Sequence, residues 1–352
     1  MSVSSRPYID PVEGLIARAK ATAAPLALPS TAAEWRAWHE RTLIQVREMI
    51  GPYPDPVPLN VEVVERHDEG SYVREKVLYD SEAFATVPAW LFTPKDIKDG
   101  ERRPAILCAH GHGRGKDDPA GILPPPDDPN YAQQKERQSG VNYAQQLAER
   151  GYVCLAPDWR GFGERQGPRE WRRDSRDGCN ALYLGYGYLG FQLLALDIWD
   201  GMRGIDLLQG LPNVDPDRIG MIGLSFGGTM TTYLSALDER VRCADIVCYL
   251  STLEDAIGHR GRGNTCGSQF ARGLLTFGDI ASVAGLIAPR PCLVEVGELD
   301  DCFVKDDALR CYADVERIFA AAGVADRLDL DLHPGGHAFS GAKAFDWFDR
   351  WL

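Results

Sequence analysis

The sequence contains no long hydrophobic run. Nowhere among its 352 residues do 18 apolar residues follow one another, which argues against an ordinary transmembrane helix. The first residues, MSVSSRPYIDPVEG, have neither a basic segment nor an apolar core, so we expect no secretory signal. Positive charge is scarce, because 38 Lys and Arg are set against 51 Asp and Glu, a formal net charge of −13. An acidic field repels phosphates, and we therefore expect neither nucleic acid nor a membrane surface as a partner.

Cysteine pairs at metal-binding spacing are also missing. The nine cysteines are an odd number, contain no CxxC pair, and several lie inside apolar runs such as AILCAH and YVCLAP. Buried thiols in a reducing cytoplasm explain this pattern better than a disulfide framework or a zinc site. We therefore expect a cytoplasmic protein without a metal site, and a composition that is 44% hydrophobic and 25% charged is typical of a globular one.

The first part of the chain reads as an extension. We expect residues 1–55 to be mainly helical and to pack on the core, because TAAEWRAWHERTLIQVREMIG has apolar residues at helical spacing between a Thr31 cap and a Gly51 stop. PYPDPVP then breaks the chain. The segment 61–94, rich in β-branched and aromatic residues with turn signals between them, predicts two or three antiparallel strands.

From residue 103 onward, short apolar runs alternate with helical patterns. Six of these runs are expected to be strands: PAILCAHG, YVCLAPD, RIGMIG, CADIVCYL, PCLVEVGE and LDLDLHPGG. We find no internal repeat in the sequence. This alternation predicts an α/β domain over residues 56–352, with a mostly parallel, doubly wound sheet and helices on both faces. The polar, proline-rich stretch around 114–140 is expected to be an insertion loop over one end of that sheet.

The motif GLSFGG points to a nucleophile. Ser225 lies in a G-x-S-x-G pattern between a predicted strand and a predicted helix, where glycine neighbours permit a tight turn that exposes the serine hydroxyl. The amide of Phe226 would point into the same space and stabilise an oxyanion. An ordinary glycine-rich bend is the alternative, and the strand and helix on either side favour the nucleophile.

A serine hydroxyl needs a base and an acid, and on this turn type they follow it in the chain as Asp or Glu and then His. His337, in a glycine-flanked loop after a strand, is the expected base, with His333 as the alternative. Asp300, on the loop after PCLVEVG, is the expected acid, with adjacent Asp301 as its competitor or both as mere helix caps. Structural roles are expected for the histidines at positions 39, 67 and 259.

HGHG, residues 110–113, follows a buried strand and is expected to supply the second oxyanion donor. We assign this role to the amide of His112, with Gly113 as the next candidate and as a substrate-binding residue. A metal pair formed by His110 and His112 is the rival interpretation, but no third ligand lies at a suggestive spacing.

Two further segments near the predicted site allow two readings each. In DWRGFGER, Arg160 and Arg165 could bind a charged or hydroxylated substrate, although ion pairs that fix the loop, such as Asp158 with Arg160, account for them as well. The aromatic stretch LYLGYGYLGFQ, residues 182–192, fits either an acyl pocket or, preferably, core packing.

Taken together, GLSFGG, GELDD, GGHAF and HGHG make residues 80–352 resemble the α/β-hydrolase superfamily. APDWRGFGER and LIAPRP are similar to the branch of dienelactone-hydrolase-like proteins and acetyl xylan esterases. The resemblance implies hydrolysis of carboxylic esters without a cofactor by the triad Ser225, Asp300 and His337. Two features differ from that branch: dienelactone hydrolases use cysteine where Ser225 stands, and sugar deacetylases typically have glutamine in place of Phe226 and an RGQG-like loop in place of RGFG.

The sequence therefore predicts a serine esterase that acts through an acyl-enzyme on a small-molecule ester, including short-chain or acetyl esters of carbohydrates. Its alternatives are a peptidase or amidase of the prolyl-oligopeptidase type, an acyltransferase with the same triad, and a non-catalytic binding protein that keeps the fold. A homo-oligomer is compatible with all of these.

Overall fold

A nine-stranded mixed sheet organises the protein. The computed structural model describes residues 8–168, 177–253, 257 and 266–352. The strands lie in the order β1-β2-β3-β5-β4-β6-β7-β8-β9, antiparallel from β1 to β5 and parallel from β5 to β9. Their bounds are Glu62–Asp68 (β1), Tyr72–Glu82 (β2), Ala85–Pro94 (β3), Arg103–Ala109 (β4), Val153–Pro157 (β5), Val214–Leu224 (β6), Val241–Val247 (β7), Cys292–Gly297 (β8) and Leu328–His333 (β9).

The central strands are buried on both faces, as their apolar sequences predict. In β4, Leu107 belongs to one apolar cluster and Ile106 to the other, and Leu155 and Cys154 divide in the same way in β5. Successive strand residues point to opposite faces, so each strand separates two cores. The predicted α/β fold with a mostly parallel sheet is confirmed.

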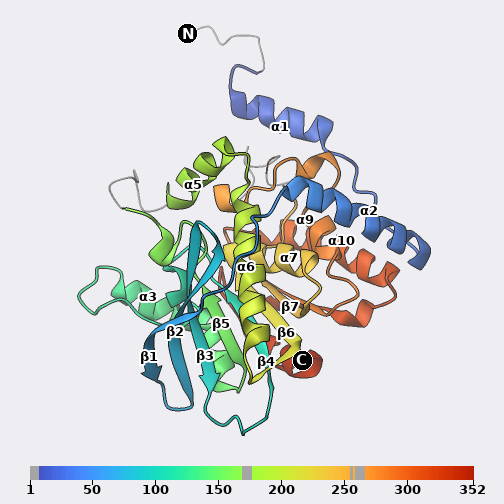
Figure 1. The fold of residues 1–352 in the computed structure, drawn as a ribbon. Coiled ribbons are helices and arrows are strands. Elements are labelled where there is room, and N and C mark those ends of the chain that lie inside the picture. Colours follow the sequence, from blue (N-terminus) through green and yellow to red (C-terminus); the bar gives the residue numbers. More distant parts are fainter. Residues whose placement is uncertain (1–7, 169–176, 254–256, 258–265) are drawn as a thin grey trace.

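Helices cover both faces of this sheet (Figure 1). Residues of α2, α6, α7, α9 and α10 fill one cluster, and residues of α4 and α11 fill the other. The helices are α1 Pro11–Thr22, α2 Ala32–Ile50, α3 Tyr131–Arg137, α4 Tyr143–Glu149, α5 Asp177–Tyr188, α6 Leu193–Gly210, α7 Phe226–Leu237, α9 Ile280–Gly285, α10 Lys305–Ala321 and α11 Ala344–Trp351, with short 3₁₀ turns at η1 Gly115–Asp117, η2 Gln138–Gly140, η3 Gly163–Arg165, η5 Gly267–Gln269, η6 Leu274–Thr276 and η7 Ala325–Arg327.

The N-terminal segment contains two helices, and α1 projects away from the sheet in Figure 1. Thr31 caps α2 by accepting a hydrogen bond from the Glu34 amide, and Gly51 ends that helix at φ 87°, as the sequence predicts. Val46 and Ile50 of α2 are buried in the core. Across the described ranges, no single helix has the length and apolar character to cross a membrane; residues 178–188 and 193–210 meet that criterion only when joined across a sharp bend.

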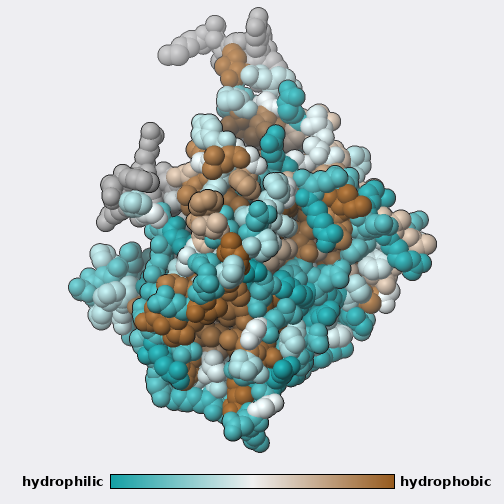
Figure 2. All heavy atoms as spheres, in the orientation of Figure 1, coloured by the Kyte–Doolittle hydropathy of each residue, from teal (hydrophilic) through white to brown (hydrophobic). Residues whose placement is uncertain are grey.

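Hydrophobic residues also reach the surface. In Figure 2, brown atoms gather over α5 and over the region of strands β1 to β3. Tyr188 and Leu189 at the end of α5 are 92% and 72% exposed, so this part of the aromatic stretch 182–192 does not pack in the core as preferred from the sequence. The segment around 114–140 forms η1, α3 and η2 rather than a plain loop.

Candidate active site

Ser225 stands on a strained turn between β6 and α7. Its φ of 62° lies in the region that favours glycine, one of three such non-glycine residues in the part of the chain described. The turn is held because the Ser225 amide donates to the Val247 carbonyl at 2.9 Å, while the Ser225 carbonyl accepts from the Thr229 amide at 3.0 Å. The backbone conformation thus lifts the serine out of the line of the strand.

The glycines around Ser225 are required by close backbone approach. A Cβ on Gly227 would lie 2.0 Å from the Ala109 carbonyl oxygen, and one on Gly223 would lie 2.4 Å from Gly227. Gly111 sits against the same turn, since a Cβ there would be 3.3 Å from that of Ser225. The HGHG loop after β4 is therefore packed directly on the serine turn. Phe226 is the first residue of α7, where backbone amides have no helical acceptor.

Asp300 and His337 meet at the carboxyl ends of β8 and β9. Asp300 Oδ2 lies 2.8 Å from His337 Nδ1, and Oδ1 accepts hydrogen bonds from the amides of Cys302 (2.7 Å) and Phe303 (2.9 Å). Burial disfavours the charged carboxylate, but the hydrogen bond from His337 and those amides outweigh it and lower the pKa of Asp300. The His337 ring is stacked on Phe303, with ring centroids 5.9 Å apart.

The alternative acid, Asp301, and the alternative base, His333, do not take part in this contact. Asp301 is exposed, and it is Asp300 whose carboxylate contacts His337. His333 is buried, accepts a hydrogen bond from the Gly335 amide at 3.2 Å, and is not among the cavity-lining residues. His39 contacts the Leu286 carbonyl and His67 is exposed on β1, whereas the residue at position 259 lies outside the described residues.

The two histidines of HGHG have different surroundings. His110 is fully buried, accepts a hydrogen bond from the Trp159 amide at Nε2 and contacts the Gly111 carbonyl through Nδ1. Burial lowers the pKa of His110 to about 3, so it is neutral and carries its proton on Nδ1. The His112 side chain instead lies 2.9 Å from Cys266 Sγ. Both ring nitrogens of His110 have hydrogen-bond partners, which argues against the rival interpretation of a metal site shared by these two histidines.

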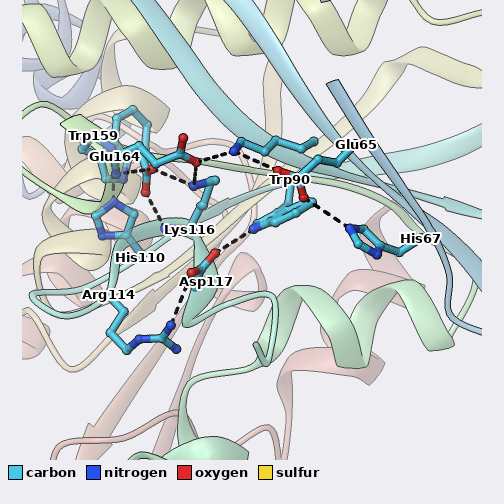
Figure 3. A network of polar contacts seen from close by, with 11 residues as sticks. Glu65, His67, Trp90, His110, Arg114, Lys116, Asp117, Trp159 and Glu164 are labelled. Carbon is cyan, nitrogen blue, oxygen red and sulfur yellow. Dashed lines mark hydrogen bonds and ion pairs between the residues drawn. The ribbon is translucent and has the colours of Figure 1, made fainter. Parts of the chain in front are cut away.

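A polar network joins the loop after β4 to the loop after β5 (Figure 3). Asp158, fully buried, accepts from the Lys116 amide at 2.7 Å and from Lys116 Nζ at 3.0 Å, and the Glu164 amide donates to it at 3.0 Å. Lys116 Nζ also contacts Glu164, and Lys76 extends the network to β2. These contacts fix the HGHG loop against DWRGFGER, and hence against the serine turn.

The side chains of Arg160 and Arg165 form ion pairs inside the protein, and neither is among the residues that line the cavity described below. Arg160 is 2% exposed and binds Asp200 of α6 through two hydrogen bonds of 2.8 and 2.9 Å, and Arg165 binds the same carboxylate at 2.7 Å. Although burial opposes it, these two arginines lower the pKa of Asp200 to about 2. The ion-pair interpretation is right, but the partner of Arg160 is Asp200, while Asp158 pairs with Lys116.

A cavity of about 1020 Å³ opens where these loops meet. Ser225, His337, Gly111, His112 and Gly113 all line it, so the structure brings the predicted nucleophile, base and second donor loop to one space. Other parts of its wall come from segments outside the parallel strands: Arg137, Val141, Asn180, Tyr183, Cys266, Gly267, Gln269 and Phe270. Tyr183 is the member of the aromatic stretch that reaches the cavity.

Sequence reasoning missed the cysteines in and around this cavity. Cys266 lines the wall beside His112, Cys179 contacts Cys266, and Cys248 follows β7 with its thiol near Asp300 and His337. Burial raises the pKa of the Cys248 thiol, which keeps it protonated beside the acid and the base. No sequence motif marks these residues, because each belongs to a different segment of the chain.

Comparison with known proteins agrees with the fold. A model of the family "X-Pro dipeptidyl-peptidase (S15 family)" matches residues 88–282, more than half of the chain. A Bacillus subtilis protein named as a hydrolase, YtaP, is 26% identical over 88% of this chain and 98% of its own length. A Pseudomonas aeruginosa protein, PA2218, is 30% identical over 47% of this chain but only 34% of its own length.

Solved structures share the architecture at low identity. A Bacteroides fragilis protein named as an acetyl xylan esterase has a TM-score of 0.75 at 19% identity, covering 94% of this chain and 84% of its own. The glucuronoyl esterase of Solibacter usitatus has a TM-score of 0.64 at 17% identity, covering 94% and 98%. These likenesses show the α/β-hydrolase fold. The family model, which matches more than half of the chain, shows that the chain belongs to the X-Pro dipeptidyl-peptidase (S15) family.

Proposed function

We propose that the protein is a serine hydrolase of carboxylic esters, with Ser225 as nucleophile, His337 as general base and Asp300 as the residue that orients the base. One observation carries the proposal. The Asp300–His337 hydrogen bond ends at the same cavity that Ser225 enters from its strained turn. A serine, an imidazole and a carboxylate that follow three strands of one sheet are the parts that acyl transfer requires.

In this mechanism His337 Nε2 takes the proton of the Ser225 hydroxyl as its oxygen attacks the ester carbonyl. The amides of Phe226 and His112 donate hydrogen bonds to the developing oxyanion. His337 then gives the proton to the departing alcohol, which leaves an acyl group on Ser225. Water, deprotonated by His337, attacks this acyl-enzyme, releases the acid and restores the serine. Asp300 remains charged throughout and stabilises the imidazolium.

The named relatives guide the choice of substrate. The two solved structures described above carry esterase names, which supports esters of modified carbohydrates, including acetyl esters, as the substrate class. The family match favours a second candidate, a peptidase that cleaves after proline. We also infer a cytoplasmic location, supported by the burial of seven of the nine cysteines.

The test compares initial rates on p-nitrophenyl acetate, acetylated xylan oligomers and a dipeptidyl p-nitroanilide with proline in the second position. We expect ester hydrolysis, a loss of at least ~10³-fold in kcat for Ser225→Ala, and wild-type rates for Ser139→Ala, an exposed serine. A higher kcat/KM on the proline substrate than on any ester would favour the peptidase. Ester turnover that survives in Ser225→Ala would refute the mechanism.

A further inference from the structure

Three ligands of the kind that bind soft metal ions meet in the cavity wall. They are His112 after β4, Cys179 in the first turn of α5 and Cys266 immediately before η5, and their ligand atoms all lie within 4.8 Å of one another. His112 Nε2 is 2.9 Å from Cys266 Sγ, and the two thiols share a side-chain hydrogen bond. Ser268 Oγ lies 2.8 Å from the same Cys266 sulfur. Ligands from three segments thus converge on one point.

The two segments that carry the cysteines are tied together. The Gly267 amide donates a 2.8 Å hydrogen bond to Asn180 Oδ1, which joins the residue after Cys266 to the residue after Cys179. A Cβ on Gly267 would lie 2.4 Å from that of Tyr183, so η5 is packed directly on α5. Gln269 of η5 donates to Thr229 of α7 at 2.8 Å. The position of the two sulfurs is therefore set by a supported backbone.

The imidazole is held by aromatic packing. The rings of Phe162 and Phe226 are stacked with centroids 4.9 Å apart, and the His112 ring contacts both, at 5.1 Å and 5.6 Å. This packing leaves Nε2 directed at the Cys266 sulfur. The two phenylalanines occupy the positions at which the sequence differs from the sugar deacetylases.

The charge distribution also suits a cation. A metal ion binds its cysteine ligands as thiolates, so binding of the cation would release the protons of both thiols. The net charge of −13 adds a general attraction for cations.

We propose that His112, Cys179 and Cys266 form a binding site for a soft divalent cation, with Zn²⁺ as the best fit. Zinc accepts sulfur at about 2.3 Å and imidazole nitrogen at about 2.0–2.1 Å, and a site with three protein ligands keeps one position open. Here the open position faces the cavity, because His112 and Cys266 both line it. An imidazole has no part in a disulfide, whereas it is a common ligand of Zn²⁺. The proposal does not depend on ester hydrolysis.

The test uses Co²⁺ as a spectroscopic probe on the purified full-length protein, kept in a non-thiol reductant after treatment with a chelator. We expect one equivalent of Co²⁺ to produce sulfur-to-cobalt charge-transfer absorption, which Zn²⁺ then abolishes by displacement. Cys266→Ser should weaken cobalt affinity by at least ~100-fold, because partners outside the ligand shell alone account for roughly 10–100-fold. His112→Ala, at an exposed side chain, should weaken binding yet retain sulfur absorption.

Cys302→Ser is the matched control, because Cys302 also lines the cavity but does not belong to this cluster. It should bind Co²⁺ like the wild type. Asp300→Asn should do the same, which separates this cluster from the neighbouring group of Cys248, Asp300 and His337. Circular dichroism establishes that each variant is folded. The proposal fails if the reduced wild type shows no sulfur-to-cobalt absorption with cobalt in excess, or if Cys266→Ser keeps the wild-type spectrum and affinity.

Discussion

Asp300 Oδ2 lies 2.8 Å from His337 Nδ1. With Nδ1 donating to the carboxylate, Nε2 is left as the nitrogen that accepts a proton. Two backbone hydrogen bonds link the loops that carry these residues, from the Glu298 amide to the His333 carbonyl and from Leu299 to Gly335. The orientation of the imidazole is thus set by the backbone as well as by the carboxylate.

We predict that Asp300→Asn lowers kcat for ester hydrolysis by ~10⁴-fold, because an amide can hold the imidazole in the wrong tautomer. Asp301→Asn, at the adjacent exposed carboxylate, is the control and should stay near the wild-type rate. Steady-state kinetics on one chromogenic ester measures both. Similar losses in the two variants would contradict the assignment of the acid.

Gly227→Ala should destabilise the protein severely. The new Cβ would lie 2.0 Å from the Ala109 carbonyl oxygen, and because Cβ is fixed by the backbone, no rotamer relieves this clash. Gly185→Ala is the control, since a Cβ at this exposed helical position of α5 meets nothing within 4 Å and should add up to ~1 kcal/mol. Urea unfolding of the three proteins compares them. A Gly227→Ala protein with wild-type stability would show that the turn is looser than described.

The buried ion pair of Lys116 and Asp158 should matter more than an exposed one. Asp158→Ala leaves Lys116 buried with Glu164 as its remaining anionic contact, and we expect a loss of about 3 kcal/mol in the free energy of unfolding. Asp329→Ala breaks the Lys343 pair, whose side chains are both 44% exposed, and should cost at most about 1 kcal/mol. Equal effects in denaturant unfolding would argue against a structural role for the network in Figure 3.

Stability should fall as the pH rises through the range set by Glu295. Burial raises its pKa to about 8, and the nearby Asp331 adds to the effect. A carboxyl whose folded pKa exceeds its unfolded value favours the folded state below the unfolded pKa of 4.5, and this contribution is lost as the pH rises to about 8. Glu295→Gln should flatten that slope, measured by unfolding between about pH 5 and 8, and Glu298→Gln, at an exposed carboxylate, should not. An unchanged slope in Glu295→Gln would contradict the raised pKa.

Zinc should inhibit the proposed esterase, since the metal position opens into the cavity of Ser225. We expect Zn²⁺ to lower the wild-type rate and a chelator to restore it. The ratio of rates with and without Zn²⁺ should approach one in Cys266→Ser and match the wild type in Cys302→Ser. Equal ratios in all three proteins would show that Zn²⁺ inhibits by binding at a site that does not include Cys266.

The sequence was sufficient for the parts of the site that have local signatures. Ser225 is marked by its glycines, and Asp300 and His337 could be found because each follows an apolar strand in a fixed chain order. Asp300 rather than Asp301 contacts the imidazole because the loop turns only one of two adjacent side chains inward.

Other features depend on contacts between distant segments. Asp200, the partner of Arg160, lies in an apolar helix and carries no motif. The meeting of His112, Cys179 and Cys266 depends on how two loops and the start of α5 pack together. Local sequence patterns do not indicate which distant segments come into contact. For the same reason, the exposure of Tyr188 and Leu189 at the end of α5 could not be predicted from the sequence.

The groups proposed for proton transfer follow β6, β8 and β9, whereas α3, α5 and η5 contribute much of the wall of the cavity around them. These two sets of segments are separate along the polypeptide. Related proteins can therefore differ in the segments that form the cavity wall and still keep the residues proposed for proton transfer. Grafting residues 131–141 from a relative should therefore alter which molecules enter, without rebuilding the reacting centre.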